Sequence, residues 1–325
     1  MTQRAISRRR WMAAAAAAPV VVRVASAQRL SGRPVTIIVP FSAGSGPDLV
    51  ARIFAEWMQR RWNQPFIVDN RVGASGNIGT AAVARAAPDG HTLLLTANTL
   101  AMNVSLFRSL PYDPIASFAP VVMLVESSFV LVAAASAPGD LRGFLELARR
   151  RPGEVTYASP GIGTPHHLAM ELFRRRAGID LTHVPYRGLA QAVSDVTGGQ
   201  VAAMFLPASA ALELARSGRV QLLAVAAAQR LPIAPQLPTL AELGVAGVDV
   251  DNWWGLLAPA GTADAIIAQL NGAANEMLAD PAIAQRLTDQ GLTLRGGPPE
   301  LLRRQIAADL IRWAAVVREA GITPE

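Results

Sequence analysis

The sequence predicts an α/β protein of two domains, which two crossing strands join at a hinge. Short β-branched runs alternate along the chain with segments of helical periodicity, a pattern typical of sheets covered by helices. Twice, a strand leads through a loop of small residues into a helix that begins with proline. A chain of 325 residues is long enough to form two such domains.

The first of these units starts at residues 35–39, a β-branched run that ends at Pro40 and predicts a strand buried on both faces. Pro47 and Asp48 then open a helix whose apolar positions follow the helical period. Between the strand and the helix lies a loop of small residues, Ser42, Ala43, Gly44, Ser45 and Gly46. Such a loop presents backbone N–H groups at the positive end of a helix, so it suits an anionic ligand.

The second unit repeats the arrangement. Residues 154–158 predict a strand, residues 159–164 (SPGIGT) a small-residue loop, and Pro165 the start of a helix. Two such loops could face each other across a cleft between domains. The alternative is that each loop only connects a strand to a helix.

The elements between the two units follow a βαβαβ order. Residues 66–69 and 92–96 predict strands, and the glycine-rich stretch 71–79 leads into a helix between them. Asn98 and Thr99 follow the third strand and start another helix. This order predicts a parallel sheet with helices on its faces.

The chain is expected to cross between domains at residues 111–133 and to return at residues 248–257. The tail, residues 262–321, is expected to be helical throughout, with breaks at 280–281 and 296–298. Further strands are expected at residues 121–125, 129–133, 181–184, 201–205 and 220–225, and further helices at residues 141–150 and 189–196. The predicted domains are therefore residues 28–125 with 250–325, and residues 126–249.

The amino terminus has the layout of a cleaved export signal. A basic region is followed by an apolar run and by the small triplet Ala25-Ser26-Ala27, so the predicted signal is residues 1–27 and the mature chain begins at Gln28. Arg8 and Arg9 resemble the pair of a twin-arginine signal, which predicts export to the periplasm by that route. A general secretory signal rich in arginine is the alternative.

The net charge of +6 does not indicate a nucleic-acid partner. Five arginines precede Gln28, and the rest of the chain carries 25 arginines against 24 acidic residues, a balance of +1. The chain contains no cysteine, so disulfide and thiolate chemistry are excluded.

Catalytic and cofactor motifs are poorly represented in the sequence. Ser45 and Ser75 lie in glycine-rich stretches, but neither fits the G-x-S-x-G elbow of serine hydrolases. Leu49 stands where G-x-G-x-x-G needs its third glycine, and no phosphate-binding loop with lysine is possible. The histidines lack the spacing of metal ligands, so we expect neither metal nor cofactor. They are His91, His166, His167 and His183.

Three further residues have two interpretations each. Asp48 could contact a ligand, but a first-turn acid that stabilises its own helix is the preferred interpretation. Trp253 and Trp254 could stack on a ligand, or at least one of them packs at the hinge.

Short stretches spread over nearly the whole mature chain carry a family pattern. In order, they are IIVPFSAGSGPDLVAR, VDNRVGASGNIGT, AAPDGHTLLL, LPYDP, FAPVVML, YASPGIGTPHHLAMELF, HVPYRG, TGGQVAAMF, LPTLAELG and WWGLLAPAGT. In number and order they resemble the Bug (TctC-type) family of periplasmic solute-binding proteins, which serve tripartite tricarboxylate transporters. The resemblance implies a type II-like Venus-flytrap fold with a small carboxylate in the cleft between the domains.

The resemblance also implies which residues bind the ligand, through backbone N–H groups, hydroxyls and ordered waters of the two loops. Pro47 departs from the family pattern, which has a small hydroxyl residue before Asp48. Leu206 departs as well, because many members have aspartate there to receive an ammonium group, so a plain or aromatic carboxylate is favoured over an amino acid. A core leucine is the alternative for this position. The expected ligand-binding residues are Phe41, Ser42, Ala43, Gly44, Ser45, Gly46, Asp48, Asn98, Thr99, Ser159, Gly161, Ile162, Gly163, Thr164 and Leu206.

The function that the resemblance implies is capture of a small organic carboxylate in the periplasm and its delivery to the membrane subunits of a transporter. The expected protein is a monomer without enzymatic activity. Two alternatives remain: a binding protein that reports its ligand to a receptor, and an α/β enzyme acting on an anionic substrate. Candidate nucleophiles and bases for the enzyme are Ser45, Ser159, His166 and His167.

Overall fold

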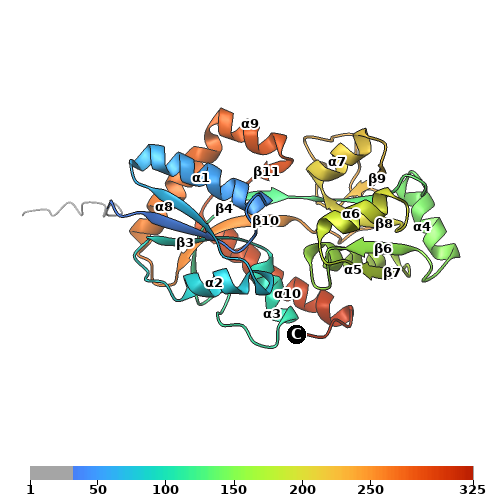
Figure 1. The fold of residues 1–325 in the computed structure, drawn as a ribbon, viewed down its shortest axis with the longest axis horizontal. Coiled ribbons are helices and arrows are strands. Elements are labelled where there is room, and N and C mark those ends of the chain that lie inside the picture. Colours follow the sequence, from blue (N-terminus) through green and yellow to red (C-terminus); the bar gives the residue numbers. More distant parts are fainter. Residues whose placement is uncertain (1–31, 325) are drawn as a thin grey trace, which may run out of the picture.

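The computed structural model describes residues 32–324, so the predicted export signal and its cleavage site lie outside the described residues. The described chain forms two lobes, each of which is a β-sheet with helices on both faces (Figure 1). This arrangement confirms the predicted α/β class with two sheets.

The first sheet has six strands in the order β11-β4-β10-β3-β1-β2. Strand β1 pairs in parallel with β2 and with β3, as the βαβαβ order predicts. The remaining pairs, β10 with β3 and β4, and β11 with β4, are antiparallel. The strands are β1 (Val35–Val39), β2 (Phe66–Asn70), β3 (Thr92–Ala97), β4 (Phe118–Ser127), β10 (Asn252–Pro259) and β11 (Leu292–Leu294).

Helices cover both faces of this sheet because its strands are apolar on both sides. Ile37 of β1 belongs to the apolar cluster under α1, α8 and α9, and the adjacent Ile38 to the cluster under α2, α3 and α10. The helices are α1 (Gly46–Trp62), α8 (Asp264–Ala279), α9 (Pro281–Asp289), α2 (Asn77–Ala84), α3 (Thr99–Leu106) and α10 (Pro299–Glu319); a 3₁₀ turn, η1 (Ala74–Gly76), precedes α2.

The second sheet has five strands in the order β7-β6-β8-β5-β9. Helices α4 and α5 cover one face, and α6 and α7 cover the other. The strands are β5 (Phe129–Ala134), β6 (Thr156–Ser159), β7 (Thr182–Pro185), β8 (Ala203–Pro207) and β9 (Val220–Val225). The helices are α4 (Leu141–Arg150), α5 (Pro165–Ala177), α6 (Leu189–Thr197) and α7 (Ala208–Arg216).

Two elements differ from the sequence-based expectations. The sequence pattern predicts no helix between β8 and β9, where α7 lies, because β8 ends at Pro207, α7 begins at the next residue, and no turn residues mark the helix start. The prediction that the tail is helical throughout is wrong at β11, a short strand at the edge of the first sheet. Its pairing with β4 is a contact between segments far apart in the sequence, so local periodicity does not reveal it.

The two lobes are joined at a hinge of two extended segments. Strand β4 continues into β5 through Ser128, and the return segment reaches β10 through Asp251. The Ser128 hydroxyl donates a hydrogen bond of 2.6 Å to Oδ1 of Asp251, which ties one segment to the other.

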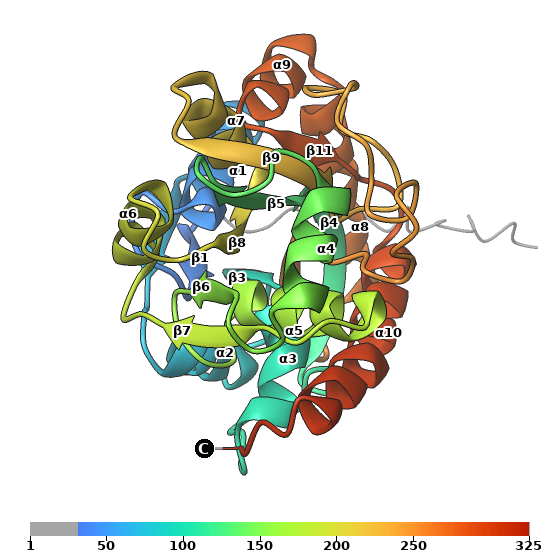
Figure 2. The same cartoon turned by 90° about the vertical axis from the view of Figure 1, so that its right-hand side faces the viewer.

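Helix α10 makes a third connection between the lobes. Trp313, Val316 and Val317, in its carboxyl-terminal half, belong to the same buried apolar cluster as Phe144 of α4 and Phe173 of α5. Figure 2 shows α10 running from the first lobe past α5. The end of this helix therefore packs on the second lobe, although the predicted boundary assigns residues 250–325 to the first domain.

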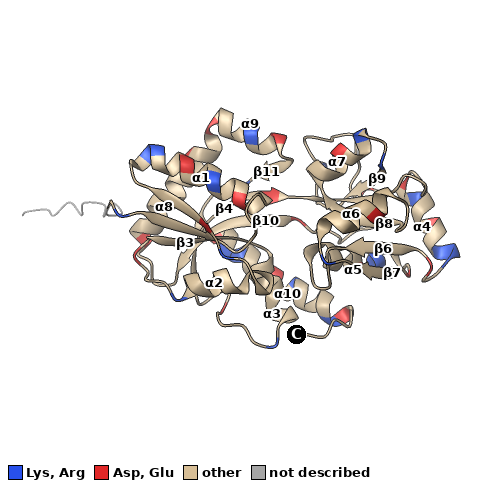
Figure 3. Ribbon diagram, in the orientation of Figure 1, with Lys and Arg blue, Asp and Glu red and all other residues tan. Residues whose placement is uncertain are grey.

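Charged residues of both signs are interspersed along the helices of both lobes (Figure 3). Within residues 32–324, none of the helices has both the length and the apolar character that a membrane span requires.

The hinge contains an acid that we expect to make stability depend on pH. Burial raises the pKa of Asp251 from 3.8 to about 6; the Ser128 hydrogen bond opposes this shift, and the charge of Glu126 adds to it. Ionisation of Asp251 therefore destabilises the folded protein, and this cost appears as the pH rises from about 4 to about 6. We expect Asp251→Asn to raise the free energy of unfolding by about 2 kcal/mol at pH 7.5 and to have little effect at pH 4.

Urea unfolding of the wild type and of Asp251→Asn at both pH values measures this difference. Asparagine retains an oxygen that can accept the Ser128 hydrogen bond, so the comparison isolates the charge. An equal effect at the two pH values would show that burial does not raise the pKa of Asp251 in the folded protein.

Candidate functional site

The first small-residue loop lies between β1 and α1 and is held in place by Asp48. This carboxylate is buried and accepts three hydrogen bonds: from the Gly44 N–H (2.8 Å), Arg52 Nε (2.9 Å) and Asn70 Nδ2 (2.9 Å). Burial acts to raise the pKa of Asp48, but these hydrogen bonds outweigh it and the pKa is lowered. Asp48 is therefore ionised at neutral pH, and it fixes the loop from behind.

The start of α1 offers N–H groups that the rest of the described chain does not use. The N–H groups of Gly46 and Asp48 lie in the first turn and have no hydrogen-bond partner among residues 32–324, as is usual for a helix start. A Cβ atom at Gly46 would lie 2.7 Å from Cζ2 of the Trp254 indole. Glycine is therefore required here for the loop to lie against Trp254.

The second small-residue loop follows β6 and leads into α5. Ser159 is the last residue of β6, is fully buried, and has its Oγ 2.7 Å from Nε2 of His183 and 3.0 Å from the Gly161 carbonyl. Thr164 caps α5, since its Oγ1 accepts from the His167 N–H and donates to the same Gly161 carbonyl. These bonds close the loop into a defined turn.

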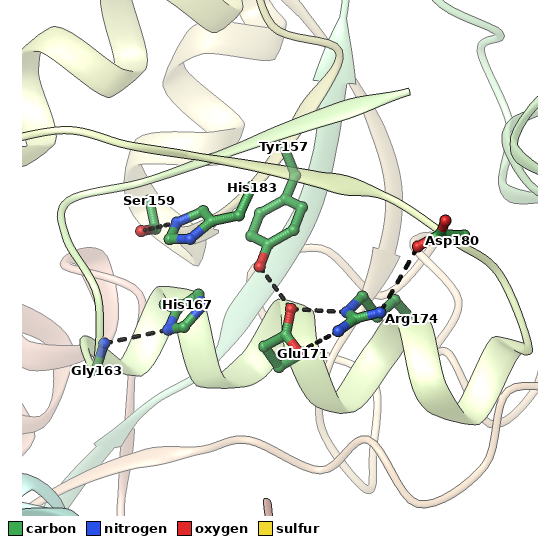
Figure 4. A network of polar contacts seen from close by, with 8 residues as sticks. All are labelled: Tyr157, Ser159, Gly163, His167, Glu171, Arg174, Asp180 and His183. Atoms are coloured by element: carbon green, nitrogen blue, oxygen red, sulfur yellow. Dashed lines mark hydrogen bonds and ion pairs between the residues drawn. The ribbon is translucent and has the colours of Figure 1, made fainter. Parts of the chain in front are cut away.

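Behind this loop lies a buried polar network, shown in Figure 4. Nδ1 of His167 accepts a hydrogen bond of 3.1 Å from the Gly163 N–H, and the His167 ring stacks on the His183 ring with centroids 4.2 Å apart. The Tyr157 hydroxyl donates to Glu171 (2.7 Å), which also binds Arg174 through both carboxylate oxygens. The network is anchored on β6, β7 and α5, so it couples the loop to the core of the second lobe.

The histidines of the network are neutral at physiological pH. Burial lowers the pKa of His183 to about 4, with the neighbouring His167 acting in the same direction. Burial also lowers the pKa of His167, against the opposing charge of Glu171. Neutral imidazoles can accept the hydrogen bonds that the loop offers them.

We expect His183→Phe to reduce the loss of stability that the protein shows as the pH falls from 7 to 5. The unfolded chain protonates His183 near pH 6.5 and the folded chain only near pH 4, so wild-type stability falls between these values. From pH 7 to pH 5 the wild type should lose about 2 kcal/mol that the variant does not lose. Phenylalanine keeps the ring stacking, and its cost at pH 7 is about 1 kcal/mol for the lost Ser159 contact. Equal losses in urea unfolding of both proteins would contradict this assignment.

Two cavities lie between the lobes. Residues of both loops line the first cavity, whereas the first loop and the start of α5 line the second. The first cavity, of about 310 Å³, brings together six of the expected site residues: Phe41, Ser42, Thr99, Ile162, Gly163 and Thr164. The second cavity, of about 300 Å³, takes three others, Gly44, Ser45 and Gly46, together with His166, Asn252 and Trp254. The exposed Ala43 lies in the loop between the two sets. The structure thus brings the two predicted loops together across the gap between the lobes.

Several expected site residues are buried behind the cavities. Asp48 is 3% exposed, and its bonds match the preferred interpretation of an acid that stabilises its own helix and loop. Asn98 is 1% exposed and lies at the hinge, where its Nδ2 is 3.5 Å from the Asp251 carbonyl. Ser159 is fully buried at the start of the second loop and bonds to the half-buried Gly161 of the same loop, and neither residue lines either cavity.

Leu206 lies in the core and not beside the loops. It is fully buried and belongs to the apolar cluster between the second sheet and helices α6 and α7, with Val130 of the adjacent strand β5 and Val225 of β9. The expectation that Leu206 contacts the ligand is therefore corrected to the alternative, a core leucine in a strand. The residue no longer bears on whether the ligand carries an ammonium group.

Some cavity residues were not predicted. Gly73 and Ser75 line the first cavity from the loop before α2, where Ser75 has a positive φ of 53°. The glycine-rich stretch 71–79 is visible in the sequence, but its pattern predicts only a connection between a strand and a helix. Asn103 of α3 and Asn252 of β10 have no local signal, because they reach the cavities through the packing of whole elements.

The two tryptophans have different surroundings. Trp253 is buried and donates a hydrogen bond of 2.7 Å from Nε1 to Asp309 of α10, so it packs at the hinge. Trp254 lines the second cavity. The sequence-based interpretation that at least one of them packs at the hinge is confirmed.

The described residues contain one serine–histidine contact that resembles a catalytic pair, between Ser159 and His183. The serine is fully buried, so a substrate carbonyl cannot reach its oxygen without opening the core. Across residues 32–324, no three histidine, aspartate or glutamate side chains come together to hold a metal ion.

A family model described as "Tripartite tricarboxylate transporter family receptor", TctC, matches residues 50–322 of the chain. The protein belongs to this family. The match covers the second small-residue loop, residues 159–164, and begins after the first loop, residues 42–46.

Relatives of this TctC-family protein support the assignment. It is 40% identical to BugT of Bordetella pertussis over 308 residues, which cover 94% of this chain and 93% of BugT. The solved structure of R. palustris Rpa4515 with adipate has a TM-score of 0.80 at 34% identity and covers 90% of this chain and 99% of that chain. The periplasmic binding protein BugD has a TM-score of 0.77 at 32% identity, covering 91% and 100%. The expected Bug/TctC resemblance and the periplasmic-binding-protein fold are confirmed.

Proposed function

We propose that this TctC-family protein captures a small organic carboxylate between its two lobes in the periplasm and delivers it to the membrane subunits of a tripartite transporter. The observation that carries the proposal is that two helix-start loops, one from each lobe, line the first cavity together. The relative Rpa4515, solved with adipate, supports a carboxylate as the ligand.

We also propose where the mature chain begins and how it divides into two domains. The mature protein starts at Gln28 after export by the twin-arginine route, and it acts as a monomer. Residues 28–125 with 250–325 form one domain and residues 126–249 the other, with the end of α10 packed on the second. Closure about the hinge brings the loops onto the ligand.

The carboxylate is held by N–H donors and not by a cation. The residues lining both cavities include no arginine, and the free N–H groups of Gly46 and Asp48 lie at the positive end of α1. Each hydrogen bond to a charged group contributes about 1.5–3 kcal/mol. Three or four such bonds account for micromolar affinity, which requires about 8 kcal/mol.

A calorimetric screen of mono-, di- and aromatic carboxylates on the mature protein tests the proposal. At least one class should bind with micromolar affinity and release heat, because hydrogen bonds to an anion dominate the contact. Absence of binding across all three classes would reject carboxylate capture. A signal that disappears when the carboxylate is replaced by its methyl ester would support capture through the anionic group.

A further inference from the structure

The second cavity is lined by side chains that have buried polar atoms without a partner. These atoms are Ser45 Oγ, both ring nitrogens of His166, Asn252 Oδ1 and Trp254 Nε1. They come from the loop before α1, the start of α5 and strand β10, so they converge from both lobes and the hinge. A buried polar atom without a hydrogen bond destabilises the structure that buries it. A ligand that supplies the missing partners would therefore favour the closed arrangement of the lobes.

The cavity carries no formal charge. Its lining residues include no aspartate, glutamate or arginine. His166 packs edge-on against Phe129, with ring centroids 4.8 Å apart, and burial lowers its pKa to about 4, so the ring is neutral at pH 7. A second carboxylate or an ammonium group placed here would lose its hydration without meeting an opposite charge.

The unpartnered atoms define what the ligand must offer. Trp254 Nε1 is only a donor and Asn252 Oδ1 is only an acceptor, whereas a neutral His166 provides one of each. Trp254 is 7% exposed, and its indole ring lies against Gly46, at the anion-binding end of α1. A group that bonds both Trp254 and Asn252 therefore needs both an acceptor and a donor.

We propose that the second cavity receives an uncharged tail that both donates and accepts hydrogen bonds, so that the ligand is a monocarboxylate with an amide or hydroxyl group at its far end. The inference rests on the proposed carboxylate capture and makes it more specific. Ser45, His166, Asn252 and Trp254 are then the residues that determine specificity for the tail.

A series of ligands with one scaffold and different ends tests the tail by calorimetry on the mature protein. The linear series is adipic acid monoamide, 6-hydroxyhexanoate, hexanoate, adipate and 6-aminohexanoate. The aromatic series is 4-carbamoylbenzoate, 4-methylbenzoate and terephthalate. In the scaffold that fits, the amide and hydroxyl ends should bind roughly tenfold more tightly than the methyl and the charged ends, because each is an uncharged group that both donates and accepts hydrogen bonds. Tighter binding of adipate or terephthalate would overturn the inference and leave carboxylate capture intact; silence of every ligand would reject both.

Two matched variants test whether Trp254 causes the preference for the amide end. Trp254→Phe keeps an aromatic ring and removes the donor, so it should reduce the preference for amide over methyl about tenfold. Trp57→Phe is the control, because its Nε1 is also buried without a partner but Trp57 does not line the second cavity. An unchanged preference in Trp254→Phe, or an equal change in Trp57→Phe, would show that Trp254 does not determine the specificity for the tail.

Discussion

Leu206→Asp should lower the free energy of unfolding by on the order of 4 kcal/mol, because it places a carboxylate in an apolar core without a partner. The side chain of Leu206 is fully buried, and the residues of its cluster are hydrophobic. Urea unfolding of the mature protein at pH 7 measures the loss. Part of it should be recovered at pH 4, where the aspartate can be buried in its neutral form.

Leu206→Met is the matched control, since it keeps an apolar side chain of similar volume and should cost less than about 1.5 kcal/mol. Neither variant should change which ligands bind, provided that the protein remains folded. A stable Leu206→Asp protein that binds amino acids more tightly than the wild type would place residue 206 in the cleft and refute its assignment to the core.

Gly46→Ala should reduce the affinity for the carboxylate at least about a hundredfold. The added methyl group would overlap the Trp254 indole, which is buried and cannot move aside without disturbing the sheet beneath it. The loop must then shift, and the N–H groups of the first turn of α1 no longer meet the ligand together. Losing two hydrogen bonds to an anion is sufficient for a change of this size.

Gly272→Ala provides the comparison, because a Cβ atom at this position in α8 would have no atom within 4 Å. It should leave affinity unchanged and slightly raise stability, since alanine favours the helix. Thermal unfolding of Gly46→Ala separates loss of the site from loss of the fold. Wild-type affinity in Gly46→Ala would show that neither the loop nor Trp254 holds the ligand.

The strand–loop–helix units could be predicted from the sequence because their signals are local. Pro47 and Pro165 mark helix starts, and each follows a small-residue loop that follows a buried strand. The two loops that line the cavities were recognised in this way. The return crossing was found as well, because the apolar segment that becomes β10 is long and free of turn residues.

What the sequence did not reveal depends on contacts between distant segments. The direction of the Leu206 side chain is set by the packing of helices α6 and α7 on the sheet, and residues 203–206 are apolar at every position, so alternation cannot indicate which face is the cleft. No local pattern links His183 to Ser159, because the two residues meet only when β6 and β7 pair.

The packing of α10 on both lobes limits how they can move. Two bodies joined by two segments can rotate about the line through those segments, whereas a third attachment away from that line removes this freedom unless it bends or separates. Trp313, Val316 and Val317 form the third attachment, so wide opening must either uncover these side chains or carry the end of α10 along with the second lobe. The exposure of that apolar surface to water acts as an elastic restraint, and the range of opening is thereby set by the end of α10, close to Ile322 and Thr323, which line the first cavity.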